Sequence, residues 1–227
     1  MNTKFLIFLQ GTELEHIVDK VIRHPNYERD TVDNDIALLK IKTNEEFYEE
    51  SYRSRMPRYQ RNIPKKKPAT ALPTICLPEQ DEPLPTDATC TILGWGKVKA
   101  GDLLGSSVLK EARIPIVSDE QCRNYFEESG YYFSPNMFCA GKKDGQIDAC
   151  KGDSGGPILC EKDGRWSIYG ITSFGEECGK KDNYGIYAKV PNYVDWIHEK
   201  IATLEWNLWE IVLVSQAYRS VLWLCLF

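Results

Sequence analysis

Short hydrophobic runs alternate with turn-forming residues through most of the chain. The runs are rich in Val, Ile, Tyr and Trp, and clusters of Pro, Gly and Asp separate them. Residues of these types favour strands, and their short spacing is typical of a barrel or sandwich of antiparallel strands. The pattern predicts strands at Ile17–Ile22, Ile36–Ile41, Thr89–Leu93, Trp166–Ser173 and Gly185–Val190.

One segment has the period of a helix instead. Val194, Ile197, Ile201 and Leu204 follow one another at intervals of three and four residues. Side chains with this spacing lie on one face of an α-helix. The pattern therefore predicts a helix at Tyr193–Leu204, close to the C-terminus.

Two loops differ from their surroundings in charge. Residues 43–72 begin acidic and become basic, with seven Lys and Arg residues and no acidic residue within 51–67. Because like-charge blocks are usually solvated, we expect an insertion exposed to water there. A polyanion-binding or processing site is the alternative. Residues 79–86 form a second, proline-rich acidic loop.

The end of the chain, residues 204–227, is an apolar tail. Glu210, Gln216 and Arg219 interrupt it, whereas a membrane-spanning helix needs around 20 residues with few charges. We therefore expect no membrane insertion. The tail is expected to lie on the surface or to be disordered.

Composition narrows the class of protein. With 227 residues, of which 42% are hydrophobic, the chain can form one large β domain or two small barrels. Its net charge of −5 gives no general attraction to nucleic acid or anionic membranes. Eight cysteines without a Cys-x-x-Cys pair indicate disulfides and an oxidising compartment rather than a zinc site. The apolar run Phe5–Leu9 is too short for a signal peptide, so we expect the chain to lack the front end of a secreted protein.

The most informative segment is Asp148–Pro157, which reads Asp-Ala-Cys-Lys-Gly-Asp-Ser-Gly-Gly-Pro. Glycines around Ser154 let the backbone turn tightly and bring N–H groups beside the serine oxygen. These are the requirements of an acyl-transfer nucleophile. A glycine-rich surface turn is the alternative.

These ten residues resemble the nucleophile loop of the chymotrypsin/trypsin-like serine proteases. The resemblance runs from about Thr12 to Thr203. Its other landmarks are Arg23–Tyr27, Asp33–Leu39, Cys76–Pro78, Gly94–Gly96, Met137–Gly141 and Ser173–Gly175.

The resemblance implies an all-β, chymotrypsin-like double β-barrel with a C-terminal helix. Residues 1–203 would form the protease domain, lacking its N-terminal part, so that the first barrel is incomplete and the second is whole. Residues 43–72 would be an insertion in it, and residues 204–227 a tail of non-family sequence. We expect the incomplete barrel to fold poorly, because missing strands would leave unpaired edges.

The resemblance also assigns catalytic roles. Ser154 would be the nucleophile, and the backbone N–H groups of Gly152 and Ser154 would form the oxyanion hole. Asp35 would be the buried carboxylate that orients a histidine. A helix cap or turn is the alternative role for Asp35.

The specificity pocket follows from the same resemblance. Asp148 would lie at its base, implying cleavage after Arg or Lys, with a solvated surface position as the alternative. Gly175 and Gly185 would leave room for a long side chain. Ser173 and Phe174 would lie along the substrate backbone.

Further residues would support the fold and its activation. The resemblance implies the disulfides Cys90–Cys160, Cys122–Cys139 and Cys150–Cys178. Cys76 matches the position that links two-chain members to an upstream light chain. Asp153 matches the carboxylate that pairs with a new N-terminal amine after activation, and no activation sequence occurs here. We expect Asp153 to turn to solvent or to stay protonated.

Histidine is the largest departure from the family. The chain contains only His16, His24 and His198, and none lies in an Ala-Ala-His-Cys motif. Recruitment of His16 as a base is an alternative that requires the right geometry. Losing the histidine alone costs about 10⁶ in turnover in the serine protease subtilisin. We therefore expect little activity from this chain.

Two functions remain open. The first is a trypsin-like serine endopeptidase represented by an incomplete chain that is inactive as written. The second is a pseudoprotease or truncated isoform that binds peptides, protein inhibitors or polyanions. Either would be extracellular by family, act on a polypeptide substrate or inhibitor, and use no cofactor. Only Glu13 remains of the family's calcium loop, so we expect no metal.

Overall fold

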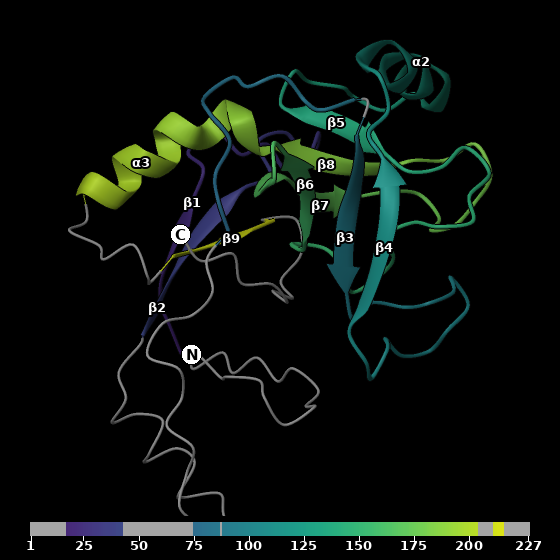
Figure 1. Ribbon diagram of the computed structural model, residues 1–227, viewed down its shortest axis with the longest axis horizontal. Coiled ribbons are helices and arrows are strands. Elements are labelled where there is room, and N and C mark those ends of the chain that lie inside the picture. Colours follow the sequence, from purple (N-terminus) through teal and green to yellow (C-terminus); the bar gives the residue numbers. More distant parts are fainter. Residues whose placement is uncertain (1–16, 43–74, 87, 204–210, 216–227) are drawn as a thin grey trace, which may run out of the picture.

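The computed structural model describes residues 17–42, 75–86, 88–203 and 211–215 (Figure 1). These residues form a three-stranded sheet of order β1-β2-β9 and a six-stranded sheet of order β4-β3-β6-β7-β8-β5, antiparallel throughout. The elements are β1 (Ile17–Arg23), β2 (Ala37–Lys42), β3 (Thr89–Gly94), β4 (Lys110–Pro115), α2 (Asp119–Ser129), β5 (Met137–Ala140), β6 (Pro157–Lys162), β7 (Arg165–Phe174), β8 (Gly185–Lys189), a 3₁₀ turn (Val190–Tyr193), α3 (Val194–Thr203) and β9 (Ile211–Val214). The all-β class with a C-terminal helix is confirmed.

The six-stranded sheet curls until its two outer strands approach each other. The chain just beyond β4 pairs with β5 through a bridge between Ile116 and Ala140. Phe138 of β5 and Tyr187 of β8 stack inside the sheet, with ring centroids 5.4 Å apart. Gly170 of β7 makes room for them, because a Cβ there would lie 2.6 Å from the Phe138 ring. This curled sheet holds most of the candidate site.

The described part of the chain contains two α-helices, α2 and α3, with different boundary residues. α2 starts after Ser118, whose hydroxyl accepts the N–H of Gln121, and stops at Gly130 in a left-handed conformation. This helix was not predicted, although the Ser-x-x-Gln spacing and the following glycine are known helix boundaries. The prediction of α3 is confirmed to within one residue at each end.

The five predicted strands correspond to β1, β2, β3, β7 and β8. β4, β5 and β6 were not predicted. Neither was β9, which lies within the tail. For Ile211–Val214 the expectation of a surface or disordered segment is wrong, because β9 pairs with β2 and Leu213 is only 1% exposed. The insertion at 43–72 and the rest of the tail lie outside the described residues.

The described residues form three disulfides: Cys90–Cys160, Cys122–Cys139 and Cys150–Cys178. They are the pairs that the resemblance implied. Each such link typically stabilises a secreted domain by about 2–4 kcal/mol. Cys76 forms no disulfide with another described residue. Within the described part of the chain, no helix is both long enough and apolar enough to cross a membrane.

Candidate active site

A cavity of about 230 Å³ opens where the nucleophile loop meets the end of β7 and the start of β8. Six residues expected to form the catalytic site or the specificity pocket lie in its wall: Asp148, Ser154, Ser173, Phe174, Gly175 and Gly185. They come from three separate stretches of sequence. The fold therefore brings the expected nucleophile and the expected pocket residues to one place.

Asp148 is a half-buried carboxyl group in the wall of this cavity. Its Oδ2 accepts the N–H of Gly179 at 3.2 Å, whereas its buried Oδ1 has no hydrogen-bond partner in the described part of the chain. Burial raises the pKa of Asp148 to about 6, although the N–H groups of Gly179 and Ala149 lower it. An incompletely bonded, desolvated carboxylate is stabilised by a cation that can reach it.

Of the two pocket glycines, Gly185 is the one that lies against Asp148. A Cβ on Gly185 would lie 3.1 Å from Asp148 Oδ1 and 3.2 Å from the hydroxyl of Tyr187. A side chain at Gly185 would therefore begin to fill the pocket. At Gly175 a Cβ would meet its nearest atoms at 3.8 and 3.9 Å, which is ordinary contact.

The nucleophile loop is shaped by tight backbone turns. The N–H of Asp153 donates to the carbonyl of Cys150 at 2.9 Å, and Gly155 donates to Thr172 of β7 at 2.8 Å. Gly152 has a φ of 104°, in the left-handed region that favours glycine. Ser154 itself is half-buried, and its hydroxyl makes no hydrogen bond to another described residue.

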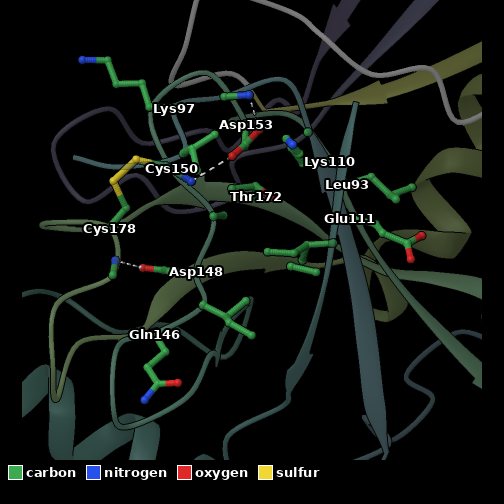
Figure 2. A pocket seen from close by; sticks show the side chains of 18 residues that line it. Leu93, Lys97, Lys110, Glu111, Gln146, Asp148, Cys150, Asp153, Thr172 and Cys178 are labelled. Atoms are coloured by element: carbon green, nitrogen blue, oxygen red, sulfur yellow. Dashed lines mark hydrogen bonds between the residues drawn. A yellow bond between two sulfur atoms is a disulfide. The ribbon is translucent and has the colours of Figure 1, made fainter. Parts of the chain in front are cut away.

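Asp153 lies in a second cavity of about 290 Å³, which Asp148 also lines (Figure 2). Its Oδ1 accepts the N–H of Gly96 at 2.7 Å, and its Oδ2 accepts the N–H of Cys150 at 2.9 Å. Burial raises the pKa of Asp153, and these two hydrogen bonds lower it. Of the two expectations for Asp153, the turn to solvent is wrong, because backbone N–H groups hold its carboxylate inside. The raised pKa agrees in direction with the other expectation, a protonated carboxyl group.

The position of the Asp153 carboxylate requires glycine at both ends of the Gly-Trp-Gly sequence. A Cβ on Gly94 would lie 1.6 Å from Asp153 Oδ1, and one on Gly96 would lie 2.5 Å from its Cγ. Real Cβ atoms do not approach other heavy atoms so closely. Gly94 and Gly96 therefore form the cradle in which Asp153 sits.

Asp35 lies just before β2 and is 2% exposed. Its Oδ2 accepts the hydroxyl of Ser173 at 2.5 Å, which connects Asp35 to the wall of the first cavity. The hydroxyl of Ser215 donates to the same oxygen. Sequence reasoning missed Ser215, because nothing near it in the tail marks it as part of a site.

The two described histidines lie beside or on α3. The ring of His24 meets those of Tyr193 and Trp196 edge-on, at 5.3 and 4.9 Å between centroids. Burial lowers the pKa of His24, whereas the charge of Asp33 raises it. His198 is exposed on α3, and His16 lies outside the described residues.

The comparisons of this sequence with known proteins agree with one another. A family model described as trypsin matches residues 9–197. A hepatocyte growth factor activator serine protease from Mus musculus is 47% identical over 127 residues, and its counterpart from Canis lupus familiaris is equally identical over the same length. Each match covers 56% of this chain and 19% of the relative. The chain thus matches about a fifth of the length of these relatives.

Proposed function

Because the chain belongs to the trypsin family of serine proteases, we propose that its first cavity receives an Arg or Lys side chain of a polypeptide, with Ser154 beside the following peptide bond. One observation carries this proposal. Asp148, with a buried Oδ1 that has no partner among the described residues, lines the same cavity as Ser154. A guanidinium or ammonium ion would supply the missing partner.

In the reaction we propose, Ser154 Oγ attacks the carbonyl carbon of the peptide bond. The N–H groups of Gly152 and Ser154 stabilise the developing oxyanion. The carbon–nitrogen bond then breaks, and the serine proton leaves with the amine. Water hydrolyses the resulting acyl-enzyme ester and restores the hydroxyl. Asp35 would orient and stabilise the histidine that carries the proton.

We propose that hydrolysis by this chain is slow, because neither of the two described histidines lies at Ser154 to supply that base. His24 packs against aromatic rings beside α3, and His198 is exposed on that helix. A second candidate function is therefore binding without cleavage, of a peptide or a protein inhibitor. The contact of Ser215 with Asp35 favours this candidate, since it engages the carboxylate that a histidine needs.

The test uses the full chain with an arginyl thioester and with benzamidinium, an aromatic cation that resembles the arginine head group. We expect benzamidinium to bind, and the thioester to acylate Ser154 slowly, detectable by mass spectrometry and abolished in Ser154→Ala. Rapid turnover would overturn the second candidate. Failure of both ligands to bind would overturn the proposed pocket.

The raised pKa of Asp148 predicts a pH dependence. Only the ionised carboxylate pairs with benzamidinium, so affinity should rise about tenfold between about pH 5 and pH 7 and then level off.

Without ligand, the folded chain holds this proton up to about pH 6, so the ionisation of Asp148 lowers stability as pH rises from about 4 to 6. Calorimetric titration measures the first effect and urea unfolding the second. A pH-independent affinity would contradict the assignment.

We further propose an extracellular location and a polypeptide partner. The three disulfides support an oxidising compartment. Cys76, which has no disulfide partner among the described residues, would link the chain to a light chain. Non-reducing electrophoresis of the protein from its source tissue tests that link.

A further inference from the structure

The outer edge of β2, which is the edge opposite β1, pairs with β9. This strand lies outside the part of the chain that matches the trypsin family. Within the described residues, β1 occupies one edge of β2, and β9 from the tail occupies the other. β9 runs antiparallel, with Ala37 opposite Val214 and Lys40 opposite Ile211. The family match ends at residue 197, before this strand begins. Main-chain pairing of this kind is how proteins capture extended peptides at a sheet edge.

The side chain of Leu213 anchors β9 in the core. Leu213 lies opposite Leu38 in the register and is 1% exposed. It belongs to the buried cluster that joins Ile36 to Ile168 of β7 and Ile197 of α3. The segment is thus held by packing as well as by its backbone.

The residue after β9 reaches the candidate catalytic carboxylate. Ser215 is 4% exposed, and its hydroxyl donates to Oδ2 of Asp35. Ser173 donates to the same oxygen at 2.5 Å. In the triad mechanism the buried aspartate accepts the N–H of the histidine ring. Ser215 therefore engages a carboxylate that must be open to a histidine for catalysis.

From this geometry we propose that the outer edge of β2 is a strand-binding site whose occupant is the chain's own Ile211–Ser215 segment. The bound segment completes the sheet edge and caps Asp35 through Ser215. A histidine that approaches Asp35 must either share the carboxylate with Ser215 or displace this segment. The second part of the inference rests on the proposed role of Asp35, and the first does not.

Hydrogen–deuterium exchange on the full chain tests the strand site. Leu213→Asp puts a charge where the anchor is buried, so amide exchange across Ala37–Lys40 should accelerate at least tenfold. Peptides from β7 should keep their protection. Leu103→Asp is the matched control, because Leu103 is 94% exposed. Unchanged exchange across Ala37–Lys40 would overturn the proposal.

Two further variants keep the test decisive. If Leu213→Asp also accelerates amide exchange in β7, Val212→Pro is used in its place. This variant removes a backbone N–H from β9 without placing a charge in the core. For the cap, Ser215→Ala should shift the ¹³C resonance of the Asp35 carboxyl group, whereas Ser107→Ala on an exposed loop should not. No shift with Ser215→Ala would overturn the cap. None of these measurements depends on peptidase activity, so they are distinct from the test of the proposed function.

Discussion

Replacing Asp148 by asparagine is expected to weaken the binding of benzamidinium to the full chain by about 100-fold near neutral pH, or about 2.7 kcal/mol. The carboxylate at the base of the cavity has one oxygen bonded to Gly179 and one buried oxygen without a partner in the described part of the chain. Asparagine keeps the shape and removes the charge, so an entering cation loses its ionic partner. Removing one member of a buried ion pair costs about 3–5 kcal/mol, and a cavity open to water reduces this figure.

The control for this prediction is Asp182→Asn. Asp182 has the same charge, its side chain is 57% exposed, and its ion pair with Lys143 spans 4.0 Å. This variant should bind benzamidinium like the unchanged chain. Asp148→Asn should also be at least as stable as that chain, because it removes a carboxylate whose pKa burial raises. Equal affinity of the two variants would remove the support for an Arg or Lys pocket.

The residues of the cavity could be predicted because they sit in short motifs that resemble those of the trypsin-like proteases. Asp148 and Ser154 belong to one ten-residue segment, and Cys178 ties the far wall to it through Cys150. Local backbone requirements, such as the left-handed φ of Gly152, restrict the conformations that this segment can adopt. These constraints act over a few residues, so the sequence alone contains them.

The cap on Asp35 could not be predicted in the same way. Ser215 is 180 positions from Asp35, and the pairing of β9 with β2 depends on which sheet edge is available in the folded chain. Strand β9 has four residues, too few for a distinctive alternation of side chains. β5 was missed for the same reason. Its four residues are all buried, so they show no alternation of buried and exposed side chains.

Asp148 and Asp153 are carried by one loop, which makes the positions of their carboxylates interdependent. Asp148 precedes Cys150 by two residues, and Asp153 follows it by three. Asp153 accepts the N–H of Cys150, whose disulfide reaches the wall of the Asp148 cavity at Cys178. A displacement of Asp153 must therefore move the loop that carries Ser154.

Gly94→Ala is expected to produce that displacement and to destabilise the chain by about 3 kcal/mol. The new methyl group would lie 1.6 Å from Asp153 Oδ1, so the carboxylate must leave its place beside Gly94. The N–H groups of Gly96 and Cys150 would then lose their acceptor. Urea unfolding of the full chain measures the loss. Benzamidinium affinity should fall with it, because the loop beside Asp148 shifts.

The matched control for Gly94→Ala is Gly101→Ala. Nothing lies within 4 Å of a Cβ at Gly101, so this variant introduces the same methyl group without a collision. It should change the free energy of unfolding by about 0.5 kcal/mol or less. If the two variants unfold alike, the cradle does not constrain Asp153. If only Gly94→Ala is destabilised, the Gly-Trp-Gly sequence acts on the nucleophile loop through that carboxylate.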